Sequence, residues 1–492
     1  MMLLFLVFFP MAAAVCSYLI GRKDKKLRDH AVQSFCLIEF AVAAAAMGLV
    51  VAGKELSAAI PGFCGFGLSF QLDGFRALYA LVAGVMWLMT SLLSGDYFAH
   101  HYRNRNRYYF FFLLTQGATV GVFLSADLFT TFIFFEIMSF TSYTWVAHDE
   151  TPGAMRAAET YLAVAIIGGM VMLMGLFLLW NAVGTLAIDE LYEAAKACPN
   201  KGRIWAASIC ILFGFGAKAG MFPLHAWLPA AHPVAPSPAS AALSGIIVKS
   251  GVLAVIRVVF YIAGPDLLRG TWVQNIWMTL TLITVFMGSL LAFREPVFKK
   301  RLAYSTVSQV SYILFGLSVL QPEAMSGALM HVVFHAFIKC ALFLTAGVFI
   351  FKYGKTRVEE LDGIGKQLPK TLWCYTFAAL ALIGIPPTSG FISKWHLAEG
   401  ALAAPVGVFR YLGPIVLLVS ALLTAGYLLP VTVHGFLPGR DWQAVHSQQT
   451  APEKEPVGML VPLLVLAALA VLLGLFPNPV ISYVTDLAAT LL

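Results

Sequence analysis

Long apolar runs recur along the whole chain, and they restrict the folds that its 492 residues can adopt. Hydrophobic residues make up 60% of the sequence and charged residues only 12%, a balance far from that of a soluble globular domain. A helix that crosses a bilayer needs roughly 20 mainly apolar residues. The sequence therefore predicts an all-α polytopic membrane protein.

About fourteen runs reach the length of a membrane-spanning helix. They cover residues 2–20, 32–51, 70–93, 108–125, 128–147, 161–179, 204–225, 239–262, 273–293, 302–320, 325–351, 372–395, 406–434 and 458–475. The polar stretches between them are too short for a soluble domain, so residues 1–492 are predicted to form a single membrane domain.

Two of these runs, the seventh and the twelfth, are interrupted in a similar way. One reads GFGAKAGMFPLHAW from Gly214 and the other ALIGIPPTSGFISKW from Ala381. Paired interruptions at corresponding places are typical of inverted repeats, and broken helices occur in a bilayer only where they face protein or a water-filled cavity. We therefore expect N-terminal helices 1–3 in residues 1–107, five-helix repeats in 108–262 and 273–436, and a fourteenth helix in 457–492.

The positive charge of the chain, formally +7, gathers in alternate connections. Basic residues cluster in segments 22–28, 103–107, 294–301 and 352–370, and few occur in the connections between these. By the positive-inside rule the clusters are cytoplasmic, which predicts both termini on the non-cytoplasmic side of a prokaryotic cytoplasmic membrane. Because this pattern accounts for the charge, we expect contact with membrane lipid and no nucleic-acid partner.

Lys218 and Glu136 stand inside runs that should carry no charge. A lysine at the centre of a membrane helix costs roughly 2.5–3.5 kcal/mol or more, so it is seldom retained without a role. Lys218 directly precedes the first interruption, and Glu136 lies among aromatic residues in LFTTFIFFEIMSFTSY. We expect the two to pair, with Lys218 releasing its proton when they separate, since burial disfavours an unpaired charge. The alternative is a glutamate that only bonds Ser or Thr across a helix interface.

The eleventh run contains His331, His335 and Lys339 at intervals of four, and Lys249 lies in the eighth run. Residues four apart share one helix face, about 6 Å apart per step. A haem needs histidines on facing helices, a zinc site would lack a third ligand, and the seven cysteines show no ligand spacing. We therefore expect no metal and favour a proton relay, with histidines satisfied inside the core as the alternative.

The remaining candidates lie beside the two interruptions or near the ends of runs. Lys394, after the second interruption, is predicted to end the relay, unless it snorkels to the interface. His225 is a possible member of the path, whereas the prolines around His232 predict a loop or interfacial position. Arg257 is expected to anchor at the membrane interface, and Glu39 to be interfacial or to cap a helix.

Taken in order, these motifs resemble those of proton-conducting antiporter-like membrane subunits. They are Glu136, then KAGMFPLHAWLPAAHPVAPSPASAALSGIIVKSG, then HVVFHAFIK and GIPPTSGFISK, and the resemblance covers residues 73–430. The superfamily includes the membrane arm of respiratory complex I, the energy-converting group 4 nickel–iron hydrogenases with formate hydrogenlyase, and multisubunit sodium/proton antiporters. The resemblance implies fourteen helices, two inverted five-helix repeats with helices 7 and 12 broken, and proton transfer along a central hydrophilic axis.

Carried onto this chain, the resemblance implies a role for each candidate residue. Glu136 and Lys218 would form the modulating pair, Lys249, His331, His335 and Lys339 the connecting relay, and Lys394 the exit-side group. The stretch AHPVAPSPASAALSG is most similar to the hydrogenase and formate-hydrogenlyase type, since complex I members more often carry Asp where this chain has Ala230.

The resemblance also implies partners. We expect other membrane-arm subunits and peripheral redox subunits, with any nickel–iron centre, iron–sulfur cluster or quinone held by those partners and no cofactor in this chain. The leading interpretation is a proton-pumping subunit of a redox-driven complex. The alternatives are a subunit of a sodium/proton antiporter without redox coupling, a scaffold whose buried charges only pack, and a direct quinone binder, for which motifs are lacking.

Overall fold

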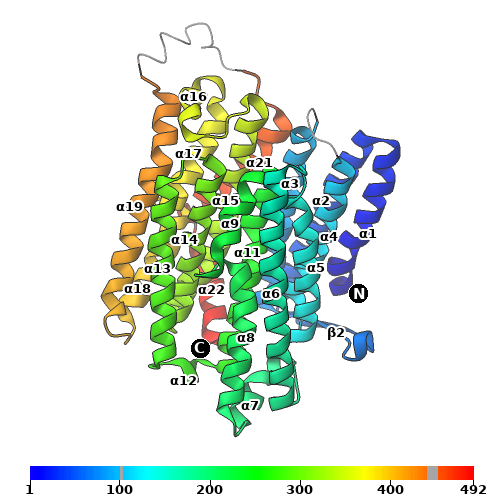
Figure 1. The fold of residues 1–492 in the computed structure, drawn as a ribbon, viewed down its shortest axis with the longest axis vertical. Coiled ribbons are helices and arrows are strands. Elements are labelled where there is room, and N and C mark those ends of the chain that lie inside the picture. Colours follow the sequence, from blue (N-terminus) through cyan, green and yellow to red (C-terminus); the bar gives the residue numbers. More distant parts are fainter. Residues whose placement is uncertain (100–103, 440–452, 492) are drawn as a thin grey trace.

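The computed structural model describes residues 1–99, 104–439 and 453–491, which fold mainly into helices running roughly along one direction (Figure 1). The N-terminal part contains α1 (Met2–Lys23), α2 (Lys25–Val51), the strands β1 (Leu56–Ile60) and β2 (Leu68–Leu72), and α3 (Gly74–Tyr97). The next part contains α4 (Arg105–Leu124), α5 (Leu128–Val146), α6 (Pro152–Val183), α7 (Ile188–Ala197), α8 (Lys201–Ala219), α9 (Trp227–Val234), α10 (Ser237–Ala242) and α11 (Val248–Ile256).

The C-terminal half begins with the short α12 (Pro265–Leu268). It continues through α13 (Trp272–Arg294), α14 (Phe298–Ser318), α15 (Pro322–Tyr353), α16 (Ile364–Gln367), α17 (Pro369–Ile383), α18 (Ser389–Ala403), α19 (Phe409–Phe436), α21 (Val457–Leu475) and α22 (Asn478–Leu491). Two π-helical segments, η3 (Leu243–Ile247) and η4 (Arg257–Ala263), flank α11. Residues 457–492, for which one helix was expected, thus contain both α21 and α22.

Ten helical segments of the described chain are long and apolar enough to cross a membrane, which confirms the prediction of a polytopic helical membrane protein. The other four predicted runs correspond to α4, α5, α14 and the pair α17 and α18. These helices are shorter or more polar; α14, for example, carries Lys299, Lys300 and Arg301 in its first turn. The sequence did not predict the antiparallel hairpin of β1 and β2, which lies where the third run was expected to begin.

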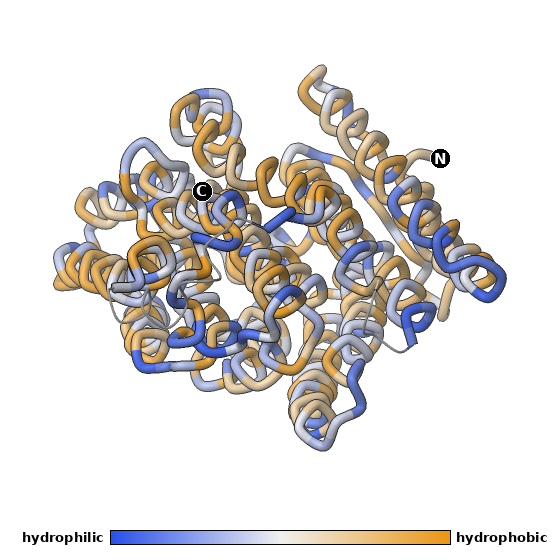
Figure 2. Tube along the Cα trace, turned by 90° about the horizontal axis from the view of Figure 1, so that it is seen from above, coloured by the Kyte–Doolittle hydropathy of each residue, from blue (hydrophilic) through white to orange (hydrophobic). Residues whose placement is uncertain are grey.

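The two ends of the helix bundle differ. In Figure 1 the connection of α1 to α2 and the short α16 lie at the upper end, whereas β2, α7, α12 and both chain termini lie in the lower half. The basic segments 22–28 and 352–370 therefore share one end of the molecule; residue 103 of another basic segment lies outside the described residues. Figure 2 looks down on the upper end and shows hydrophilic segments there among mainly hydrophobic helices.

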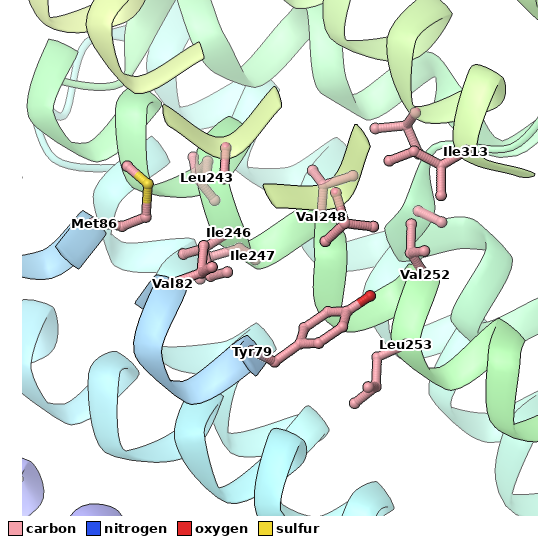
Figure 3. Packing of buried hydrophobic residues seen from close by; sticks show 14 of the residues in the cluster. Tyr79, Val82, Met86, Leu243, Ile246, Ile247, Val248, Val252, Leu253 and Ile313 are labelled. Atoms are coloured by element: carbon pink, nitrogen blue, oxygen red, sulfur yellow. The ribbon is translucent and has the colours of Figure 1, made fainter. Parts of the chain in front are cut away.

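The helices that carry most candidate residues form the centre of the bundle. The segment from α10 to η4 and helix α15 are almost wholly buried. Apolar side chains of α3, among them Val82 and Met86, pack against Leu243, Ile246 and Ile247 of η3 (Figure 3). Lys249 and His335 therefore lie on enclosed elements.

At both interruptions the chain leaves the helix through a glycine in the left-handed conformation. Helix α8 ends before Gly220 (φ 72°), and α9 begins after a short turn. Helix α17 ends before Gly384 (φ 89°), and α18 then begins at Ser389. Glycine is the residue that adopts this backbone conformation at no steric cost.

Gly390 allows α18 to pack closely against α17 at the second interruption, because a Cβ on this residue would overlap the carbonyl oxygen of Ala381 in α17. We expect Gly390→Ala to destabilise the protein by about 3 kcal/mol or more, the upper range for overpacking, as measured by thermal denaturation in detergent. Gly153→Ala in α6 is the control: nothing lies near its added Cβ, so the change should be neutral or stabilise by up to ~1 kcal/mol. Equal stability of the two variants would contradict the tight packing.

Candidate functional site

Lys218 lies in the last turn of α8, just before Gly220. Its side chain is buried, and the ammonium donates hydrogen bonds to the Tyr161 hydroxyl of α6 (2.5 Å) and the Ser139 hydroxyl of α5 (3.2 Å). The ammonium also lies 4.5 Å from the centre of the Tyr161 ring and 5.7 Å from that of Trp227. All four residues line one small cavity. Hydroxyl oxygens and aromatic faces therefore surround this charge where the sequence suggested a carboxylate.

Glu136 lies on α5, one turn before Ser139, with its carboxylate against Gly169 of α6. The side chain is half-buried, and its enclosed Oε1 atom has no hydrogen-bond partner in the described structure. No ion pair joins Glu136 to Lys218 among the described residues. The expected pair is therefore open here: Lys218 of α8 bonds Ser139, one turn from Glu136 on α5, and the modulating role of the pair stays a prediction.

Lys249 and His335 are in direct contact at the centre of the bundle. The Lys249 ammonium lies 2.7 Å from Nδ1 of His335 and donates to the Ser244 carbonyl (2.6 Å), which belongs to the π-helical segment η3. A neutral imidazole with a free Nδ1 accepts from the ammonium and carries its own proton on Nε2. That Nε2 atom is buried and has no hydrogen-bond partner in the described structure. A single proton can therefore be shared between the lysine and the histidine.

His331 extends this contact along α15. Its ring stacks on that of His335, with centroids 5.6 Å apart, and on that of Tyr312 at 5.8 Å. Its Nδ1 atom is 2.9 Å from the Ser393 hydroxyl, and its Nε2 atom is 3.1 Å from the side-chain oxygen of Gln309. The spacing of four thus stacks the two histidines on one side of the helix, where His335 contacts α11 and His331 contacts α14 and α18.

Lys394 lies on α18 next to Ser393, which binds His331. Its ammonium donates to the carbonyl oxygens of Leu382 (2.6 Å) and Ile383 (3.0 Å) and lies 4.9 Å from the centre of the Tyr312 ring. These carbonyls end α17, where a helix has no further amide donors for them. The lysine is thus turned inward, toward the interruption, and not outward to the interface.

Lys339 is buried one turn beyond His335 on α15. Its ammonium donates to the backbone carbonyl of Leu302 in α14 (2.9 Å). The structure therefore brings Lys249, His335, His331 and Lys394 into one line of contacts and leaves Lys339 beside it. No side-chain hydrogen bond in the described structure connects Lys218 to this line, although α8 and α11 are in tight contact, since a Cβ on Gly251 would meet the Ala219 backbone.

Three further candidates, His225, His232 and Arg257, form no hydrogen bond with this line of contacts among the described residues. His225 lies in the turn after the first interruption, half-buried and stacked on Phe222, without a hydrogen bond to the other candidates among the described residues. His232 was expected in a loop or interface but is fully buried and stacks on Phe343. Arg257 was expected at the interface but is buried, because its guanidinium donates five hydrogen bonds to groups on α4, α5 and their connection.

The sequence did not reveal the polar partners of the candidates, chiefly Tyr161, Tyr312, Gln309 and Ser393. Each lies in an apolar run, where a single hydroxyl or amide side chain is a weak sequence signal. Their signal was position: Ser393 directly precedes Lys394, and Tyr161 opens the sixth run. Among the described residues no three His, Cys, Asp or Glu side chains gather as a metal site, and the expectation of no cofactor stays a prediction.

Known proteins with similar sequences come from several kinds of membrane complex. A family described as NADH:quinone oxidoreductase/Mrp antiporter, TM, matches residues 125–427. NADH-quinone oxidoreductase subunit N of Desulforudis audaxviator is 31% identical over 98% of this chain and 97% of its own length. A Na⁺/H⁺ antiporter subunit of Bacillus subtilis is 28% identical (92% and 91%), and Hydrogenase-4 component B of Escherichia coli is 30% identical (83% and 62%).

Solved structures of similar fold belong to multisubunit assemblies. A chain of the membrane-bound sulfane sulfur reductase, an archaeal respiratory membrane complex, superposes with a TM-score of 0.89 at 25% identity, covering 99% of this chain and 97% of that one. A chain of the Mrp complex from Dietzia sp. DQ12-45-1b gives 0.87 at 25% identity, with the same coverage. The fold of this chain is therefore that of a membrane subunit in larger complexes.

Proposed function

The chain belongs to the family of membrane subunits shared by NADH:quinone oxidoreductases and Mrp antiporters, and from this premise we propose that it translocates protons through a buried Glu/Lys/His relay as a subunit of a redox-driven complex. The observation that carries the proposal is the contact of Lys249 with His335 and its continuation through His331 and Ser393 to Lys394. Buried groups that exchange protons mark ion pathways in membrane proteins.

In the proposed mechanism Lys218 is the loading group. Its ammonium is held by the Tyr161 and Ser139 hydroxyls, while Glu136 lies one turn away on the same helix as Ser139. Approach of the Glu136 carboxylate favours the charged lysine; its withdrawal leaves a buried cation facing neutral groups, and the proton departs toward the central line. Lys249, His335, His331 and Lys339 then pass protons across the bundle, and Lys394 delivers them on the far side.

The finer architecture forms part of the proposal. Fourteen crossings result if α4, α5, α14 and the α17–α18 pair span the membrane with the ten apolar segments. Residues 108–262 and 273–436 then form the two inverted repeats, each with one interrupted helix. The basic end faces the cytoplasm and both termini the other side of a prokaryotic cytoplasmic membrane, which the gathering of basic segments at one end supports.

Proton transport by a member of this family can be coupled to a redox reaction or to sodium exchange. The relatives include a quinone oxidoreductase subunit, a hydrogenase component and a Na⁺/H⁺ antiporter subunit at 31, 30 and 28% identity, which does not separate the types. We favour redox coupling of the hydrogenase or formate-hydrogenlyase type, on the motif AHPVAPSPASAALSG. The second candidate is a Na⁺/H⁺ antiporter subunit, which the fold shared with the Mrp complex supports.

Purification of the tagged protein with its native partners decides between the two. We expect a mild-detergent preparation to contain peripheral subunits with iron–sulfur clusters and nickel, identified by mass spectrometry and metal analysis. These cofactors would belong to the partners. A preparation with only small membrane subunits and no metal, and with sodium-dependent proton exchange in vesicles, would overturn redox coupling in favour of the antiporter.

A further inference from the structure

Glu39 is a buried carboxylic acid that lies outside the relay described above. It sits near the middle of α2 and is only 1% exposed, although an interfacial or capping position was expected for it. Neither of its carboxyl oxygens has a hydrogen-bond partner in the described structure, and no ion pair reaches it there. An ionised carboxylate in such a place is very costly, whereas a protonated one is neutral.

Polar side chains from three helices gather around Cys36, one turn from this carboxyl. Cys36 lies one turn away on the same face of α2, and its thiol is 3.7 Å from the side-chain oxygen of Gln116 on α4. Ser91 of α3 lies beside the same thiol. The amide nitrogen of Gln116 is buried and also lacks a partner in the described structure. The site is therefore polar and enclosed.

Beyond Glu39, toward the C-terminus of α2, the buried residues of the helix are apolar. Along α2 the buried residues beyond it are Ala43 and Ala46, and α3 approaches α2 there through Gly84, which lies against Phe40. Tyr108 of α4 also faces the site, and its buried hydroxyl lies near Cys36, Ser94 and Tyr97. A carboxyl at the closed end of a polar region is suited to hold a proton.

Helix α3 connects this site to the relay. Next to Ser91, the Thr90 hydroxyl lies on another side of the helix, 3.9 Å from the Cys340 thiol of α15. Cys340 follows Lys339 in the chain and interacts electrostatically with Lys249. Hydroxyls and thiols thus lie on two sides of α3, Ser91 with Cys36 toward Glu39 and Thr90 with Cys340 toward the two central lysines.

We propose that Glu39 is a proton-binding carboxyl of the N-terminal helices that exchanges its proton with the Lys249 relay across α3. The ligand is the proton alone, because a bound metal cation would need several oxygen ligands, and neither Glu39 carboxyl oxygen has even one hydrogen-bond partner in the described structure. The proposal rests on the proton-translocating function proposed above and adds a second proton-binding group, on α2, to Lys218 on α8.

Infrared spectroscopy of the reconstituted complex tests the proton on Glu39. We expect the wild type to show a deuterium-sensitive band of a protonated carboxyl that disappears in Glu39→Gln, a change that preserves the shape of the side chain. Glu159→Gln, on an exposed position of α6, should retain the band. A spectrum that Glu39→Gln does not alter would overturn the proposal.

Proton transport in the same vesicles tests the exchange with the relay. Both Glu39→Gln and Thr90→Val should lower the rate several-fold, and Thr90→Val should retain the infrared band, since it leaves the carboxyl in place. Thr160→Val, which removes an exposed hydroxyl bonded within α6, should change neither. Normal transport in Glu39→Gln or in Thr90→Val would overturn the exchange across α3.

Lys218→Ala in the same assay separates the two proposals. If this variant pumped normally, the relay function would fail while the infrared band still reported on Glu39. If it lost transport while Glu39→Gln retained it, only the inference about Glu39 would fail.

Discussion

Replacing Lys218 by alanine is expected to abolish proton translocation while leaving the chain assembled with its partners. Lys218 is the buried cation that bonds Tyr161 and Ser139, and alanine has no proton to transfer. The Tyr161 and Ser139 hydroxyls that it contacts are neutral, and Tyr161 keeps its hydrogen bond with Ser142 when the lysine is removed. We expect transport to fall roughly 10²-fold or more, the range of a lost acid–base group, as measured by acidification of vesicles containing the complex.

Lys218→Arg distinguishes a movable proton from a fixed charge. Arginine keeps the positive charge but does not release its proton in proteins, so this variant should be as inactive as the alanine variant. Lys196→Ala, at an exposed position of α7, is the matched control and should pump normally. Activity in the arginine variant would show that a fixed charge is sufficient and would contradict the loading role of Lys218.

The burial of most candidate residues could be predicted from the sequence, whereas their hydrogen-bond partners could not. Apolar runs located the helices, and the interval of four placed His331 and His335 on one face, because both signals are local to one helix. The neighbours of Lys218 depend on how α5, α6 and α8 are rotated against one another. A single sequence does not reveal that rotation, so the prediction paired Lys218 with Glu136 because the two carry opposite charges. In the structure the hydrogen-bond partners of Lys218 are Tyr161 and Ser139.

Arg257 illustrates the same limit for a structural residue. Its position near the end of an apolar run suggested an interfacial anchor. In the fold, the carbonyl oxygens of Val122, Phe123 and Ser125 at the end of α4 converge on its guanidinium. Helix ends leave such carbonyls free, and a buried arginine can satisfy several of them at once. The sequence contains no sign that these helix ends meet.

The two interruptions give their lysines a similar environment. Lys218 lies in the last turn of α8, and Lys394 bonds the carbonyls of Leu382 and Ile383 at the end of α17. The C-terminus of a helix carries partial negative charge and favours a nearby cation. Each broken helix therefore supports the protonated form of its lysine locally. A movement that displaces the helix end from the ammonium would weaken that support and release the proton, which gives the interruptions a direct part in the proposed mechanism.

Because Lys249 and His335 are in direct contact, we expect the transport losses of variants at these two positions to be strongly non-additive. Lys249→Met and His335→Leu should each reduce transport about 10²-fold, because each removes one side of the shared proton (2.7 Å between Nζ and Nδ1). The double variant should be no slower than the single variants, since residues that act as one unit lose their function together. Transport in vesicles, measured for all four proteins, gives the coupling directly.

His232 supplies the control for this cycle. It is as buried as His335, but in the described structure its ring nitrogens have no hydrogen-bond partners, and its ring stacks on Phe343. His232→Leu alone should therefore leave transport nearly unchanged, and combining it with Lys249→Met should add nothing beyond the single effect of the lysine. If the losses of Lys249→Met and His335→Leu multiplied instead, the two residues would act in separate steps, and the direct transfer between Nζ and Nδ1 would be wrong.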